Sequence, residues 1–240
     1  IILFFQIFSN DFITINTNLM DSGQYYNIIK TGNLPDNIRL NSELIYNDGT
    51  ENSFQYQSGY IRVKSNLTRT NRIQFEWERY PSSYMGSLFE KCDIIKTISF
   101  NIFDMSGIDN MNRMFHSCTS LESIFSFNPK NTRIMSYLFY NCKSLNYISF
   151  KDNSFINNQV EKMEYMFSFC ESLTSIDLSH YANKIKTMNY MFQNCTNLKK
   201  IVFNYDFDTS LVTYMDRIFY GCTNLTTLEN FNFNSSNAEV

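Results

Sequence analysis

Residues 111–124 read MNRMFHSCTSLESI, and nearly the same phrase occurs six times in this 240-residue chain. A methionine precedes each cysteine of the phrase by seven residues, and a phenylalanine precedes it by three. The cysteines are separated by 26, 24, 28, 25 and 27 residues. This regular recurrence indicates a repeat protein with a period of about 26 residues, in which each unit buries its apolar face against its neighbours.

Each repeat combines two apolar patterns. The octet from Met to Cys is apolar at its first, fourth, fifth and eighth positions, which is one face of an α-helix. The segment that follows, as in LNYISF (145–150), alternates like a short strand. We therefore predict a structural ladder of inward residues: Met85, Phe89, Cys92, Met111, Phe115, Cys118, Met135, Phe139, Cys142, Met163, Phe167, Cys170, Met188, Phe192, Cys195, Met215, Phe219 and Cys222.

A short helix and a short parallel strand in every repeat predict an α/β fold, a right-handed solenoid. Neighbouring strands lie about 4.8 Å apart, whereas packed helices need about 8–10 Å. We therefore expect the stack to curve into a short horseshoe, with strands inside and helices outside. The length differences between repeats fall just after the strand, so a loop is expected there, at one rim.

The remaining segments lack the repeat. Strict alternation in IQFEW (73–77) indicates a strand, and we predict a β-rich N-terminal capping region over residues 9–83, with a separate ligand-binding domain as the alternative. Residues 1–8, IILFFQIF, fit a signal-peptide remnant or a buried strand. The six-repeat solenoid is assigned to residues 84–240. Because residues 233–240 resemble the start of another repeat, we expect it to continue beyond residue 240.

The repeat unit also points to a family. M-x-x-[ML]-F-x-x-C-x-x-L-x-x-I-x-[LF], joined by F-D-x-S-x-[VI]-x-x-M, resembles the BspA-like leucine-rich-repeat surface proteins. The match is to their Met-Phe-Cys form, found in surface lipoproteins of wall-less bacteria and in protist surface proteins. FDMSGIDNMNRMF (103–115) and FDTSLVTYMDRIF (207–219) are the clearest copies. The resemblance implies a leucine-rich-repeat solenoid, on the cell surface or secreted, that serves adhesion or recognition and has no shared catalytic residues.

The residue types argue against several kinds of chemistry. A net charge of −3 with scattered lysines and arginines argues against nucleic-acid binding, and no apolar run is long enough for a membrane span. The cysteines are 24–28 residues apart at inward positions, which predicts free thiols rather than disulfides or metal ligands. His116 is expected on a solvated face and His180 in a variable loop. We therefore expect no cofactor, no metal and no enzymatic activity.

One outward position stands out as a candidate partner-binding stripe. The third octet residue lies opposite the buried face of the predicted helix, and tyrosine and arginine, which are enriched at binding hot spots, dominate it. The alternative is that these tyrosines only cover neighbouring repeats. The stripe comprises Arg113, Tyr137, Tyr165, Tyr190 and Arg217. Candidate glycosylation sequons begin at Asn66 and Asn234.

These observations predict a non-enzymatic cell-surface or secreted protein that mediates adhesion or recognition of a protein or glycan partner. The alternative is an intracellular, cytoplasmic repeat scaffold for protein–protein interaction, where reduced cysteines would be natural. A third reading is a purely structural coat or stalk protein.

Overall fold

The computed structural model describes strands of the N-terminal region and most of the repeats. The described residues are 12–17, 25–30, 38–39, 53–57, 60–64, 72–77, 83–100, 103–150, 159–179, 184–205, 207 and 209–232. Every regular element in these ranges is a β-strand, and none is an α-helix. The described part of the chain accordingly offers no helix with the length and apolarity needed to cross a membrane.

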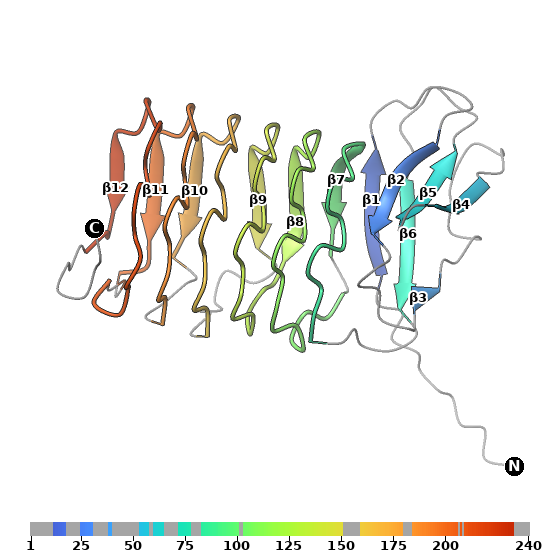
Figure 1. Cartoon of the computed structure of the whole chain (residues 1–240), viewed down its shortest axis with the longest axis horizontal. Helices are drawn as coiled ribbons and strands as arrows, with labels where there is room; N and C mark the ends of the chain where they lie inside the picture. The colour runs from blue at the N-terminus through green and yellow to red at the C-terminus, as the bar shows by residue number, and fades with distance from the viewer. Residues whose placement is uncertain are drawn as a thin grey trace, which may run out of the picture.

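Each repeat contributes one short strand, and these strands lie side by side along the molecule (Figure 1). β7, β8 and β9 pair in parallel, and so do β10, β11 and β12. The predicted strand after each octet is therefore present in all six repeats, and the chain is a solenoid of parallel strands. The bounds are β7 (Ile95–Ser99), β8 (Ser123–Phe127), β9 (Tyr147–Phe150), β10 (Ser175–Leu178), β11 (Lys200–Phe203) and β12 (Thr227–Glu229).

Further strands precede the repeats and meet them at one point. β1 lies between β6 and β7 and runs antiparallel to both, so the first sheet has the order β3-β6-β1-β7-β8-β9. The strand predicted at residues 73–77 is β6, whereas residues 1–8 lie outside the described part. The bounds are β1 (Phe12–Thr17), β2 (Tyr25–Lys30), β3 (Ile38–Arg39), β4 (Ser53–Gln57), β5 (Tyr60–Lys64) and β6 (Arg72–Trp77).

The octets do not form the α-helices that their apolar spacing predicts. Their third and seventh residues have positive φ angles, such as 58° at Arg113 and 60° at Ser117, which a right-handed helix excludes. The N–H groups at the sixth and eighth positions donate to the carbonyl three residues earlier, as His116 does to Arg113 at 3.0 Å. Each octet is therefore a run of tight turns.

Odd-numbered octet positions use their N–H groups to bond the next repeat. Four such bonds join each octet to the next repeat, three of them to the next octet and one to the residue just before it; Phe115 N–H to Leu138 O, at 3.0 Å, is one of the three. Because backbone bonds join repeats on the turn side as well as the strand side, both sides share the spacing of about 4.8 Å typical of paired strands. Figure 1 shows a nearly straight row of repeats, so the predicted horseshoe with outer helices is wrong.

The inward ladder residues form the core even though their backbone is not helical. The rings of Phe89 and Phe115 stack with centroids 5.4 Å apart, and those of Phe115 and Phe139 stack at 5.5 Å. Helices packed about 8–10 Å apart would separate equivalent rings too far for such stacking. Only Phe219 and Cys222, in the sixth repeat, are partly rather than fully buried.

The positive φ angles of the octets give a test that separates turns from helices. Lys91 is exposed and has a φ of 58°. We expect Lys91→Val to lower the free energy of unfolding by about 1–2 kcal/mol, because a β-branched residue fits this region poorly. We expect Lys91→Gly to leave it unchanged or higher, whereas a helix would lose roughly 1 kcal/mol. Urea unfolding followed by circular dichroism measures both.

Lys162→Val is the matched control for this test. Lys162 is also an exposed lysine, but it sits in an extended bridge to Ile134 and Thr187, where valine is well tolerated. A Lys91→Gly variant that loses stability while Lys91→Val keeps it would contradict the turn geometry.

Candidate functional site

The predicted stripe residues stand one above another on the turn side of the solenoid. The rings of Tyr137 and Tyr165 stack with centroids 4.7 Å apart and planes 9° apart, and those of Tyr165 and Tyr190 stack at 4.7 Å and 6°. The guanidinium carbon of Arg113 lies 5.0 Å from the Tyr137 ring centroid, and that of Arg217 lies 6.0 Å from the Tyr190 centroid. We call these five residues the aromatic column.

The backbone explains why the column is so regular. Each member occupies the third octet position, where a positive φ angle of 50–58° turns the side chain outward. The N–H of each of the first four members bonds to the next octet, as from Tyr137 to Glu164 O at 2.9 Å. Equivalent side chains therefore repeat at the spacing of hydrogen-bonded strands, which is close to the thickness of a stacked aromatic pair.

A second group of aromatic side chains widens the column on one side. Tyr140 lies 5.7 Å from Tyr137 and meets Phe169 edge-to-face at 5.6 Å, measured between ring centroids. His116 stacks on Tyr140 at 4.9 Å, and its Nδ1 lies 3.8 Å from a carboxylate oxygen of Glu90. Burial is the largest cause that lowers the pKa of His116. The expected solvated position of His116 is therefore wrong, since its side chain is only 15% exposed.

The column carries two positive charges, on Arg113 and Arg217. Some other cations are paired between repeats: Lys186 and Arg133 contact Glu161 at 2.7 and 3.1 Å. Arg113 and Arg217 are exposed, and neither forms an ion pair with a described residue. They lie four repeats apart, about 19 Å at strand spacing. Two guanidinium groups that form no ion pair with a described residue thus bracket three tyrosines.

The tyrosine hydroxyls are positioned as neutral hydrogen-bonding groups. Burial raises the pKa of Tyr137, against the opposing effect of Arg113, and burial also raises the pKa of Tyr165. These hydroxyls therefore stay protonated at physiological pH and can both donate and accept. Both faces of the Tyr165 ring are covered by neighbouring rings, so only its edge and hydroxyl are presented outward.

The cysteines form a row of free thiols, five of them buried and Cys222 partly exposed. All six thiols are free, and no described cluster of three His, Cys, Asp or Glu residues could hold a metal ion. Each thiol from the second repeat onward donates to the phenylalanine carbonyl of the preceding repeat, as Cys118 Sγ does to Phe89 O at 2.9 Å and Cys142 Sγ to Phe115 O at 3.0 Å. The sequence revealed the burial of these thiols but not this hydrogen bond.

Several predicted positions lie outside the described residues. These are the sequons at Asn66 and Asn234 and the loop residue His180. Sequence reasoning also missed Tyr140 and Phe169 as neighbours of the column, because they occupy the sixth and seventh octet positions and meet only through the turn geometry.

The fold and the repeated outward position define a leucine-rich-repeat solenoid. The family model described as the BspA type leucine rich repeat region matches the chain in six copies, over residues 65–160 and 111–240. The chain therefore belongs to the BspA-type leucine-rich-repeat family.

Comparison with solved structures gives one similar fold. The crystal structure of a leucine-rich-repeat protein from T. pallidum is 24% identical in sequence, with a TM-score of 0.46, and the alignment covers 61% of each chain. This chain thus spans less than two thirds of that protein's length. No curated protein matches the chain in sequence.

The cysteine row predicts an uneven reaction with thiol reagents. Burial raises the pKa of the thiols of Cys118, Cys142 and Cys170, and buried thiols react slowly. Cys222 is the partly exposed member. We expect iodoacetamide to label Cys222 first in the folded chain and the other five only after unfolding, as read by mass spectrometry of peptides. Rapid labelling that persists in Cys222→Ser would contradict the buried row.

Proposed function

We propose that this protein is a non-enzymatic recognition module that binds an acidic segment of a partner protein through its aromatic column. The single observation that carries the proposal is the pair of unpaired arginines, Arg113 and Arg217, at the two ends of the stacked tyrosines. Arginine and tyrosine are enriched among the few residues that dominate the binding energy at protein interfaces. Family membership supports a protein-interaction role.

The chemistry of the column favours a protein over a glycan as its partner. Saccharides bind aromatic side chains through their C–H faces, which requires an open ring face. The faces of Tyr165 are occupied by Tyr137 and Tyr190, each 4.7 Å away between centroids. A row of hydroxyls between two guanidinium groups instead suits carboxylates, which accept from both, with arginine bonding in a bidentate manner.

We further propose that the protein acts at the cell surface or after secretion, as is typical of its family; a cytoplasmic scaffold is the alternative. The N-terminal strands would serve as a cap, since β1 occupies the edge of β7 that would otherwise be unpaired. Covering an edge in this way prevents unwanted strand pairing between molecules.

The test measures binding of the chain to a panel of purified extracellular proteins by biolayer interferometry. For a partner so identified, we expect the double variant Arg113→Ala, Arg217→Ala to weaken binding by roughly tenfold or more, since each arginine acts as a hot-spot residue. Tyr165→Phe removes one hydroxyl but keeps the ring stack, and it should weaken binding severalfold. Higher salt should weaken wild-type binding as well.

The control variant removes two lysines away from the column. Lys130 and Lys199 are exposed and form no ion pair with a described residue, so Lys130→Ala, Lys199→Ala changes the net charge by the same amount. Equal loss of binding in both double variants would mean that net charge, and not the column, attracts the partner. Full binding by the arginine variant would overturn the proposed site.

A further inference from the structure

Within the described residues, the strand pairing of the solenoid is interrupted between β9 and β10. β9 ends the first sheet and β10 begins another. On the turn side the same two repeats stay joined by four backbone bonds, including Phe139 N–H to Met166 O at 2.9 Å. The two repeats therefore separate only on the strand side, away from the aromatic column.

The hydrogen bonds just before the strands show where the separation starts. Lys199 N–H donates to Thr174 O at 2.8 Å, and the residues at the same place in the second, third and sixth repeats donate similarly to the preceding repeat. In the fourth repeat the equivalent residue is Thr174, whose N–H makes no such bond to a described residue. Instead, a bond two residues earlier joins Ser172 N–H to Lys143 O at 3.0 Å. The gap thus opens from the start of β10.

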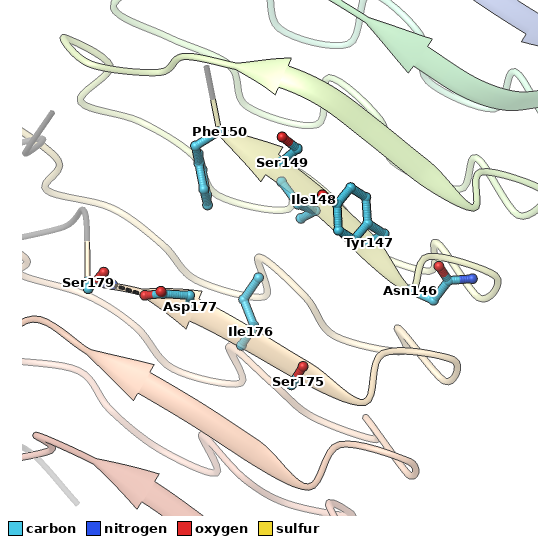
Figure 2. Close-up of a pocket in the computed structure, with 9 residues that line it drawn as sticks. All are labelled: Asn146, Tyr147, Ile148, Ser149, Phe150, Ser175, Ile176, Asp177 and Ser179. Carbon is cyan, nitrogen blue, oxygen red and sulfur yellow. Dashed lines mark hydrogen bonds between the residues drawn. The ribbon is translucent and has the colours of Figure 1, made fainter. Parts of the chain in front are cut away.

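A cavity of about 430 Å³ occupies this gap (Figure 2). Strand alternation directs Ile148 and Ile176 toward the core, where they form an apolar floor, and places Ser149, Ser175 and Asp177 around the mouth. Asp177 is the one charged residue among those that line the cavity. The site therefore combines an apolar base with a mostly neutral, hydroxyl-rich rim.

Tyr147 supplies an exposed aromatic ring to the cavity lining, and Phe125 of β8 packs against that ring without lining the cavity itself. The register of β8 against β9 shifts between Ile124 and Phe127, and Ser126 within this bulge has a φ of 55°. Bulges redirect side chains, and a strained residue of this kind often marks a functional site. Here Phe125 is 39% exposed and Tyr147 is 50% exposed, with ring centroids 5.7 Å apart. Unlike the column tyrosines, these two rings are tilted by 49° and not stacked face to face.

The polar groups at the mouth retain hydrogen-bonding capacity. Asp177 Oδ1 accepts the Ser179 N–H at 2.8 Å, and Oδ2 has no partner among the described residues. The hydroxyls of Tyr147, Ser149 and Ser175 also form no hydrogen bond with any described residue. The rim thus offers one carboxylate acceptor and three groups that both donate and accept.

We propose that this cavity binds a neutral saccharide unit, with Tyr147 against its C–H face and Asp177, Ser149 and Ser175 hydrogen-bonded to its hydroxyls. A sugar ring has one apolar face and a polar edge, which matches an aromatic side beside a hydroxyl-rich rim. The volume lies within the usual range of small-ligand sites. An anionic sugar is disfavoured, because the lining holds a carboxylate and no cation.

An extended peptide fits this gap less well than a saccharide. A peptide that joined the sheet would need about 4.8 Å on each side, or roughly twice the usual strand spacing, between β9 and β10. The turn-side bonds hold these repeats at a single spacing, and Ser172 N–H still reaches Lys143 O at 3.0 Å. We therefore expect too little room between β9 and β10 for an inserted strand. This site does not depend on the protein-binding role of the column.

The experiment exposes the whole chain to an array of neutral glycans alongside their sialylated and sulfated counterparts, and follows hits with saturation-transfer NMR using the corresponding methyl glycosides. We expect binding to neutral glycans only. Tyr147→Ala should weaken it roughly tenfold, and the isosteric Asp177→Asn should weaken it severalfold. Tyr205→Ala is the matched control, since Tyr205 is 86% exposed and does not line the cavity.

Each outcome decides the proposal. Thermal melts must be unchanged for Asp177→Asn, which keeps its result interpretable if Tyr147→Ala unfolds. The proposal is overturned if no neutral glycan binds, if only the acidic glycans bind, or if Asp177→Asn and Tyr205→Ala behave alike. Binding of a random peptide library in a Tyr147-dependent way, without glycan binding, would assign the cavity to peptides instead. The arginine variants of the column should retain full glycan binding, which separates this site from the proposed function.

Discussion

The structure depends on the four backbone hydrogen bonds that join each octet to the next repeat. The N–H groups of the odd-numbered positions leave the octet to make these bonds, and those of the sixth and eighth positions close tight turns within it, as Cys118 N–H does to Phe115 O at 3.1 Å. A helix would use every N–H internally and would hold neighbours about 8–10 Å apart. The exchange of internal bonds for bonds between repeats therefore sets one spacing on both sides of the solenoid.

The turn geometry that gives this spacing costs free energy, and the spacing brings side chains of neighbouring repeats into contact. A positive φ at a non-glycine residue costs roughly 1–2 kcal/mol, and both the third and seventh octet positions adopt it in every repeat. In return, equivalent side chains approach closely enough to stack. Phe167 and Phe192 stack at 5.4 Å in the core, and Tyr165 and Tyr190 stack at 4.7 Å outside. The same spacing lets Cys195 Sγ reach the Phe167 carbonyl at 3.0 Å.

The sequence could predict what faces inward but not how the backbone turns. Apolar residues at octet positions one, four, five and eight share one side in a helix and also in this run of turns. The core residues could therefore be predicted even though the predicted helix is wrong. The seventh position held an available clue: Asn141, Asn194 and Gly221 are residue types that tolerate positive φ. Arg113 and Tyr137 at the third position gave no such clue. The cavity between β9 and β10 was missed because the outward residues of these strands form no stripe along the strand face, although the 28-residue interval between Cys142 and Cys170 is the longest in the array.

The two candidate surfaces arise from opposite uses of the repeat. The column exists because the third octet position faces outward and recurs at a fixed spacing. Changing that one residue in a repeat therefore lengthens or shortens the column. The cavity exists because the pairing of parallel strands is interrupted between β9 and β10. In a structure bonded only through its sheet, such an interruption would separate the repeats before it from those after it. Here the turn-side bonds from Tyr137 to Glu164 and from Asn141 to Ser168 continue across it. A solenoid bonded on both sides can therefore open one side for a ligand while the other side holds the stack together.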